Sequence, residues 1–93
     1  MLFEWDENKR LRNIEEHGVD FKVAVRIFIK PVLENIDDRN DYGEIRIRAL
    51  GVTDDECFMV IYTWRKDTRR IISAWKVGQN GKRKYEAILA RSN

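Results

Sequence analysis

Apolar residues in the first third of the chain recur at helical spacing, between residues that begin and end helices. Asp6 can cap a helix through about Glu16, because its carboxylate accepts backbone N–H groups that have no partner inside the helix. Gly18 can supply the left-handed turn that ends this helix. The pattern predicts the helix after a short strand over residues 2–5.

A second helix is predicted after Asp20, another candidate cap. Its apolar residues lie at i, i+3, i+4 and i+7, which is the spacing of one helical face. Pro31 lacks a backbone N–H and bars continuation, so the helix should end near Lys30. The apolar face consists of Phe21, Ala24, Val25 and Phe28.

Beyond Pro31 the apolar period changes to two, the alternation of β-strands. Short turns join the later segments, which favours an antiparallel meander. The predicted strands are Val32–Ile36, Glu44–Leu50, Cys57–Arg65 and Thr68–Lys76, with a polar turn over 37–43 and a final helix over Lys82–Arg91. We therefore expect one α+β domain over residues 1–93.

Pairing these strands through turns of even length separates an apolar face from a basic one. The apolar face, expected to receive the helices, contains Ile45, Ile47, Ala49, Phe58, Val60, Tyr62, Trp64, Ile71, Ser73 and Trp75. The opposite face contains Arg46, Arg48, Met59, Ile61, Thr63, Arg65, Arg70, Ile72, Ala74 and Lys76. Its cations would attract a polyanion, although Lys and Arg are also ordinary solvent-side strand residues. A turn of odd length would scatter the cluster.

The distribution of charge indicates an anionic partner for the second half of the chain. Net charge is only +2, but residues 44–93 carry 11 Lys/Arg against 6 Asp/Glu, whereas residues 1–43 carry 7 against 10. The single cysteine, Cys57, excludes an intrachain disulfide and fits a reducing compartment. The sequence shows neither the order of a signal peptide nor an apolar run near the ~20 residues of a spanning helix. We expect a soluble, cytosolic protein.

Composition also restricts the chemistry that the chain can support. One His and one Cys do not supply the ligands that zinc prefers, and the sequence contains no phosphate-binding or nucleophile-elbow motif. Asp37, Asp38 and Asp41 could hold a hard cation, but Asp is common in such turns for backbone reasons. We therefore expect neither a metal nor a cofactor.

The single imidazole and the tryptophans are the remaining candidates for chemistry. His17 can act as a general base near neutral pH, and it also stands at a predicted helix C-terminus, where a partly charged ring favours the helix dipole. Trp5, Trp64 and Trp75 could stack on bases. Because Trp64 and Trp75 fall on the predicted core face, packing is the favoured interpretation for those two.

Several blocks of the sequence resemble the BrnT toxins. The opening block is the specific one: Phe3-Glu4-Trp5-Asp6, then Lys9, Asn13 and His17-Gly18-Val19, with Phe21, Ala24 and Phe28 following. Later blocks are Gly43-Glu44 with Arg46, then Arg70-Ile71-Ile72-Ser73-Ala74, and Tyr85-Glu86. The resemblance covers almost the whole chain.

This resemblance implies a RelE-like fold and a metal-independent ribonuclease. It also implies a type II toxin–antitoxin pair, in which a BrnA-like antitoxin with a ribbon-helix-helix part neutralises the toxin. The pair would form a hetero-oligomer that represses its own operon, so that operator DNA is met through the antitoxin and RNA by the toxin itself. Trp75 departs from the pattern, because the family usually has an arginine there. If that arginine stabilises phosphate charge, activity here is weak, displaced onto Lys76, or absent.

A metal-free ribonuclease activates the ribose 2′-OH against the adjacent phosphorus, so it needs a proton acceptor, a proton donor and cations. The candidate proton-transfer groups are Lys9, His17 and Tyr85, and the candidate catalytic arginines are Arg46 and Arg70. Arg48, Arg65 and Lys76 are expected to bind the RNA. The resemblance favours Lys9, His17, Arg46 and Arg70 in particular.

Two other functions compete with catalysis. The chain could be a non-catalytic module with a toxin-like fold that pairs with an antitoxin through an aromatic and arginine-rich patch, for which Trp75 is the main support. It could also bind nucleic acid without cleaving it. In that case its affinity should fall steeply with salt while the RNA stays intact.

Overall fold

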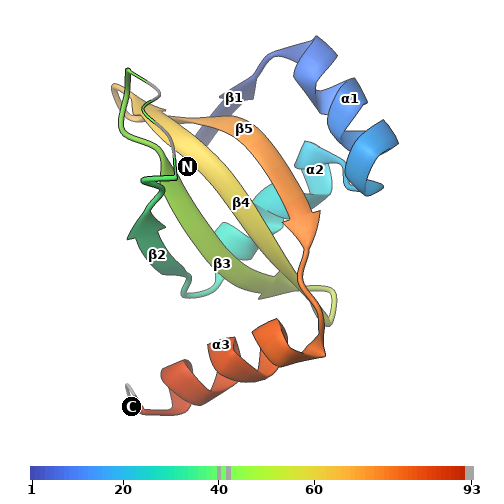
Figure 1. Ribbon diagram of the computed structural model, residues 1–93, viewed down its shortest axis with the longest axis vertical. Helices are drawn as coiled ribbons and strands as arrows, with labels where there is room; N and C mark the ends of the chain where they lie inside the picture. The colour runs from blue at the N-terminus through green and yellow to red at the C-terminus, as the bar shows by residue number, and fades with distance from the viewer. Residues whose placement is uncertain (40, 42, 92–93) are drawn as a thin grey trace.

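The chain folds around a mixed β-sheet that helices flank (Figure 1). The computed structural model describes residues 1–39, 41 and 43–91. Its elements are β1 (Leu2–Trp5), α1 (Glu7–His17), α2 (Phe21–Ala24), the 3₁₀ helix η1 (Val25–Ile29), β2 (Leu33–Ile36), β3 (Ile47–Thr53), β4 (Glu56–Arg65), β5 (Thr68–Lys76) and α3 (Gln79–Arg91). The strands form one five-stranded sheet with the order β1-β5-β4-β3-β2. The predicted α+β class is confirmed.

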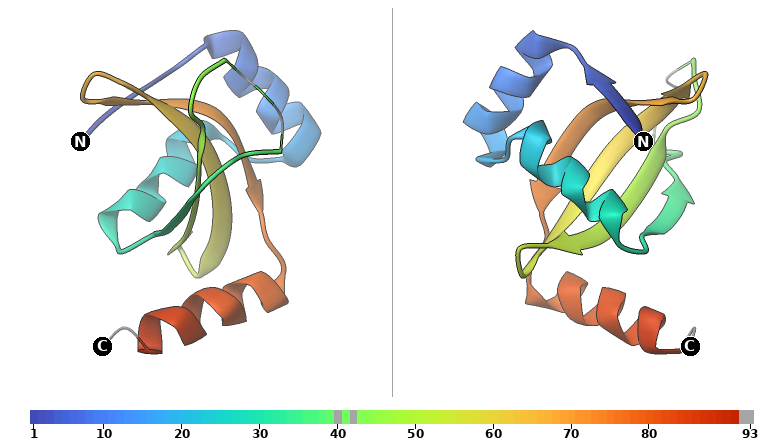
Figure 2. Two further views of the ribbon diagram at one scale, coloured as in Figure 1. Left: turned by 60° about the vertical axis from the view of Figure 1, so that its left-hand side comes forward. Right: turned by 180° about the vertical axis from the view of Figure 1, so that it is seen from behind.

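The helices occupy different sides of this sheet. Seen from behind, α2 and η1 lie across one face (Figure 2, right). This is the helix-covered face, and the other is called the open face. Helix α1 packs against β5, and α3 lies at the end of the sheet remote from the β4–β5 hairpin. In the part of the chain that the structure describes, no helix is long and apolar enough to cross a membrane.

The first turn of the meander is tighter than the sequence predicted, whereas the second lies at residues 66–67, as expected. Asp54 and Asp55 both have positive φ values, of 52° and 62°, which is the conformation of a primed hairpin turn. This turn lets β3 run to Thr53, whereas the prediction ended it at Leu50. Gly51 therefore lies inside β3. Its lack of a side chain lets η1 pack closely on the sheet, because a Cβ there would approach Ile27 Cβ to 2.8 Å.

Strand β1 was correctly predicted over residues 2–5, but not its place in the sheet. It pairs with β5 in the parallel direction, with Trp5 opposite Ile71. The remaining neighbours pair antiparallel, as the meander requires. The chain can return to β5 in this way because α1, α2 and the other strands intervene between the two strands in sequence.

A β-bulge divides β5 and changes which side chains reach the core. Tyr62 pairs with Ile71 but Ile61 pairs with Ser73, so Ile72 is the extra residue. Beyond it, Ala74 and Lys76 point to the helix-covered face. Ser73 and Trp75 point to the open face. The prediction had these four residues on the opposite faces, because strict alternation cannot anticipate an inserted residue.

The core lies between the helix-covered face and the two short helices. It contains Val19, Phe21, Ala24, Ile27, Phe28, Ala49, Phe58, Val60, Tyr62, Ile71 and Ala74. Trp64 belongs to this face but is 46 % exposed at the sheet end, where Arg69 lies 4.5 Å from its ring centroid. Its predicted use in core packing is therefore wrong, because the helices do not extend that far.

Candidate active site

Helix α1 is fixed to the edge of β5 by a buried side chain. The Asn13 amide nitrogen donates to the backbone carbonyls of Val19 and Ala74, each at 2.8 Å, and its carbonyl oxygen accepts from Ala74 N at 3.1 Å. Strand β1 ends opposite Ile71, so Asn13 supplies the hydrogen bonds that a neighbouring strand would otherwise give to Ala74. The position of α1 is thereby tied to the strand it borders.

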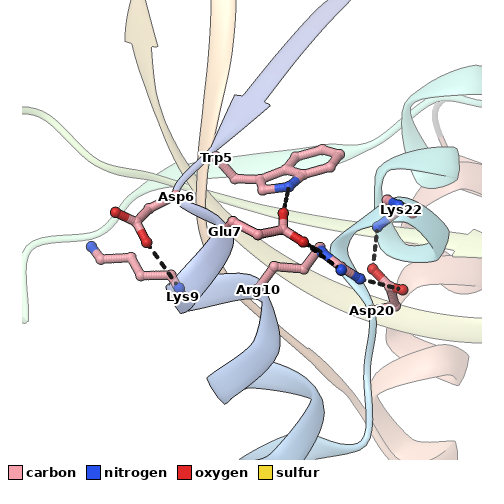
Figure 3. Close-up of polar contacts among 7 residues, drawn as sticks. All are labelled: Trp5, Asp6, Glu7, Lys9, Arg10, Asp20 and Lys22. Atoms are coloured by element: carbon pink, nitrogen blue, oxygen red, sulfur yellow. Dashed lines mark hydrogen bonds and ion pairs between the residues drawn. The ribbon is translucent and has the colours of Figure 1, made fainter.

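A second set of contacts joins the start of α1 to the following helix (Figure 3). Asp6 caps α1 by accepting from Lys9 N, as predicted. Arg10 pairs with Glu7 and, at 3.0 Å, with Asp20, the cap of α2. In Figure 3 the Lys9 side chain extends on the other side of α1 from Arg10. Arg10 is thus used in packing α1, whereas the Lys9 ammonium is directed away from that network.

The face of α1 that includes Lys9 forms a polar groove against β5. The lining residues of α1 are spaced at i, i+3, i+4, i+7 and i+8, which places them on one helical face. Ile72 and Ser73 of β5 form the other wall, and the cavity measures about 190 Å³. The α1 residues are Lys9, Arg12, Asn13, Glu16 and His17. Two predicted proton-transfer groups therefore share one groove.

Ser73 connects this groove to the open face of the sheet. Across the strands, Ser73 pairs with Ile61 and Ile61 with Arg48. In the next row along the face, Trp75 pairs with Met59 and Met59 with Leu50. The groove thus borders the open face along β5, although Ile61, between Ser73 and Arg48, is buried and only 1 % exposed.

Arg70 belongs to the same face of β5, near the β4–β5 hairpin. It pairs with Thr63 on one side and with Glu4 of β1 on the other. Its guanidinium lies 2.6 Å from the Glu4 carboxylate, and both side chains are partly exposed. The ion pair orients the guanidinium and leaves it accessible to an anion.

In the segment between β2 and β3, the residues that the structure describes lie on the side of the sheet away from α2 and η1 (Figure 2, left). Thr63 Oγ1 donates to the carbonyl of Ile45 at 2.7 Å. The Asp37 carboxylate is fully buried and accepts two hydrogen bonds from the Arg39 guanidinium, from Nε at 2.8 Å and from Nη2 at 3.0 Å, and a third from Arg39 N at 3.4 Å. The predicted turn covers residues 37–43 of this segment, of which Asn40 and Tyr42 lie outside the described residues. Residues 44–46 were predicted as strand, but β3 begins at Ile47.

Trp75 is enclosed between this segment and α1. The Arg39 guanidinium carbon lies 5.8 Å from its ring centroid, within cation–π range. The His17 ring lies 6.1 Å from it, at 41°. Trp75, where the resemblance leads us to expect an arginine, thus lies on the open face beside the groove, and core packing is the wrong use for it. Arg39 brings a cation close to the Trp75 ring.

Asp37 also affects the charge of the open face. Its hydrogen bonds from Arg39 lower the pKa of its carboxyl below the ordinary value despite burial, and Arg48 contributes in the same direction. Asp37 is therefore held as a carboxylate between two arginines. In the part of the chain that the structure describes, no three His, Cys, Asp or Glu side chains gather as metal ligands would.

The structure brings only part of the predicted site together. Lys9 and His17 line the groove, and Arg48 and Arg70 lie on the open face. Arg46 comes directly before β3, where its carbonyl accepts from Asp37 N and its Nε is buried. Arg65 pairs with Thr68 beside the β4–β5 hairpin and is exposed.

Two predicted residues lie elsewhere. The β-bulge moves Lys76 to the other face, where it forms an exposed ion pair with Glu56 at 2.9 Å. Tyr85 is 4 % exposed and donates to the carbonyl of Pro31 at 2.5 Å. Burial raises the pKa of this phenol. Arg70 lies beside the β4–β5 hairpin, and α3 lies at the end of the sheet remote from that hairpin (Figure 1), so we correct the expectation that Tyr85 joins Arg70.

Arg12, Arg39 and Asn13 are site residues that the sequence did not reveal as such. For Arg12 a signal existed, because it follows Lys9 by three residues on the helix. Arg39 reaches Trp75 only through the path of the segment between β2 and β3. Asn13 was noted as part of a sequence block, but its bonds to Ala74 span 61 residues.

Comparison with known proteins gives a family and a fold. A family model described as the ribonuclease toxin BrnT of type II toxin–antitoxin systems matches residues 5–80. The crystal structure of the Brucella abortus ribonuclease toxin BrnT superimposes with a TM-score of 0.62 at 24% sequence identity, covering 85% of this chain and 100% of that one. No curated protein sequence matches the chain. The family match extends over most of the sequence, and the resemblance seen in the opening block is confirmed. The chain belongs to the BrnT ribonuclease toxins of type II toxin–antitoxin systems.

Proposed function

We propose that this chain cleaves RNA on its open face, by metal-independent attack of a ribose 2′-OH on the adjacent phosphorus. The observation that carries the proposal is the junction at Ser73. At Ser73, the groove that contains Lys9 and His17 meets the sheet face that carries Arg48 and Arg70. Candidate proton-transfer groups and cations thus border the same face of the sheet, as such a reaction requires.

The chemistry assigns a role to each side of that junction. The 2′-oxygen forms a bond to phosphorus and loses its proton to a base, while the bond from phosphorus to the 5′-oxygen breaks. The 5′-oxygen takes up a proton, and the products are a 2′,3′-cyclic phosphate and a 5′-hydroxyl. His17 and Lys9 are the proposed proton-transfer groups. Arg70 and Arg48 stabilise the charge that grows on the phosphoryl oxygens.

Cleavage of purified bulk RNA, with and without EDTA, tests the proposal. Removing one stabiliser of this kind typically lowers the rate ~10²–10³-fold, so Arg70→Ala and His17→Gln should each cut RNA far more slowly than the parent. Arg26→Ala is the matched control, because Arg26 lies on η1 behind the sheet and pairs with Asp54. Folded variants that cut RNA at the parental rate would show that the site is wrong. Loss of cleavage in EDTA would contradict metal independence.

We further propose that a BrnA-like ribbon-helix-helix antitoxin neutralises the toxin in a hetero-oligomer. In that complex operator DNA is bound only through the antitoxin. Membership of a type II toxin–antitoxin family implies an antitoxin partner, and the remaining details are part of the proposal. Co-expression with the protein encoded by the neighbouring reading frame should relieve a growth arrest that the toxin causes alone.

A non-catalytic module that pairs with an antitoxin is the second candidate. It is favoured by the position of Trp75 between His17 and Arg39, because aromatic and arginine side chains are enriched at protein interfaces. Growth separates the two functions. An active ribonuclease arrests a host cell in the absence of its partner, and a binding module does not. Binding of RNA that remains intact would instead support a nucleic-acid binder.

A further inference from the structure

A cleft of about 600 Å³ lies where α3 faces the open side of the sheet. Its floor includes the aliphatic side chains of Leu33, Leu50 and Met59, and its wall on α3 includes Lys84 and Ile88. The volume lies within the ~300–1,000 Å³ of typical small-ligand sites. The cleft therefore has room for one nucleotide unit and an apolar surface for its base.

The cations of this cleft come from two separate elements. Lys84 contributes an ammonium from α3 and Arg48 a guanidinium from β3. The carboxylate among the lining residues that the structure describes is Glu34, which accepts a hydrogen bond from Tyr62 on the helix-covered side of the sheet. The charge presented to a ligand is thus positive. Helix α3 adds further positive charge, because its charged residues are Lys82, Arg83, Lys84 and Arg91 against Glu86.

The cleft is continuous with the proposed site of cleavage. Met59 on its floor pairs across the strands with Trp75, and Arg48 lies in the row that ends at Ser73. A strand whose reacting phosphate lies near Ser73 can therefore place a neighbouring nucleotide beside α3. The family match ends at residue 80, and α3 spans Gln79–Arg91. The wall that α3 contributes to the cleft therefore lies almost entirely beyond the family match.

We propose that this cleft is a second nucleotide subsite for single-stranded RNA, in which Lys84 holds a phosphate and the aliphatic floor contacts a base, while Arg48, on the border of the cleft, keeps its role at the reacting phosphate. The inference rests on the proposed function for the identity of its ligand. Charge and continuity with the open face favour RNA over a segment of the antitoxin. The subsite determines how much of the RNA the enzyme contacts beyond the bond that is cut.

Binding of a short fluorescein-labelled RNA with 2′-O-methyl riboses, which cannot be cleaved by 2′-OH attack, tests the subsite independently of catalysis. Each lost phosphate contact on a single strand reduces the slope of log K against log salt by ~0.7. Lys84→Ala should therefore flatten the salt dependence by about that amount and weaken binding several-fold at low salt. The matched control is Arg83→Ala, since Arg83 is exposed on the same helix and does not line the cleft.

The cleavage assay should show the same difference. Lys84→Ala should raise KM for a longer RNA with little change in kcat, and it should not affect a dinucleoside monophosphate, whose single phosphate is the one that reacts and leaves none for Lys84. Equal behaviour of the Lys84→Ala and Arg83→Ala variants would overturn the subsite, and so would unchanged RNA binding with weakened antitoxin binding. A parent protein that shows Lys84-dependent RNA binding but cuts no unmodified RNA would contradict the proposed function and leave the subsite standing.

Discussion

The two faces of the sheet use the same strands for opposite purposes. On the helix-covered face one row across β3, β4 and β5 is Ala49, Val60 and Ala74, and all three are fully buried. The adjacent row on the open face is Arg48, Ile61 and Ser73. A shift of one residue along β3 and β5 thus exchanges core for candidate chemistry, whereas in β4 the shifted residue, Ile61, is also buried. The difference teaches that stability and activity should respond to different substitutions, even where the residues are sequence neighbours.

The largest expected effect is on the helix-covered face. Ile27 of η1 is fully buried in the core, so Ile27→Ala should lower the free energy of unfolding by ~2–5 kcal/mol through lost burial and the cavity that remains. Urea denaturation followed by circular dichroism measures this loss. Arg70→Ala on the open face, whose side chain is partly exposed, should cost less than ~1 kcal/mol. Equal losses would contradict the division of labour between the faces.

Substitution of Asn13 should affect both stability and activity. Asn13→Ala leaves both backbone groups of Ala74 without their side-chain partner, which should lower the free energy of unfolding by ~1–3 kcal/mol. RNA cleavage should fall as well, because α1 carries Lys9 and His17. Asn8→Ala, an exposed change on the same helix, is the control. Should Asn13→Ala be as stable as this control, Asn13 would not be the anchor of α1.

A smaller, pH-dependent effect is expected from Asp37. Arg39 lowers the pKa of this carboxyl in the folded protein, so its contribution to stability is fully present above the unfolded value of about 3.9. That contribution is lost as pH falls through the folded value. The difference in unfolding free energy between the parent and Asp37→Asn should therefore be constant above about pH 5 and shrink below about pH 4. A difference that grows on acidification would refute this assignment.

Lys76 should show the smallest effect. Its ion pair with Glu56 is exposed, and such pairs are worth ~0–1 kcal/mol. Because the bulge turns Lys76 away from the open face, Lys76→Ala should leave both the free energy of unfolding and RNA cleavage close to those of the parent. Thermal unfolding and the bulk RNA assay check this. A large loss of cleavage would mean that the sheet faces are assigned wrongly.

The local signals in the sequence were reliable where one residue acts on its neighbours. Asp6 and Asp20 cap their helices, and Gly18 has a φ of 68° at the end of α1. The candidate site was only partly predictable. Lys9 and His17 lie in one groove, as their spacing of eight residues on one helix predicts. Lys76 and Trp75 were misplaced because one inserted residue in β5 reverses the faces beyond it.

Capping, alternation and helix-breaking residues are properties of short stretches, so the sequence by itself determined the helices, the strands and the order in which they occur. It also determined the family, through the opening block. Only the tertiary structure decided that β1 lies parallel to β5, that Arg39 reaches Trp75, and that α3 closes a cleft over Arg48. These contacts join segments far apart in the chain, and their geometry depends on how the whole sheet twists, bulges and packs, which no local pattern encodes.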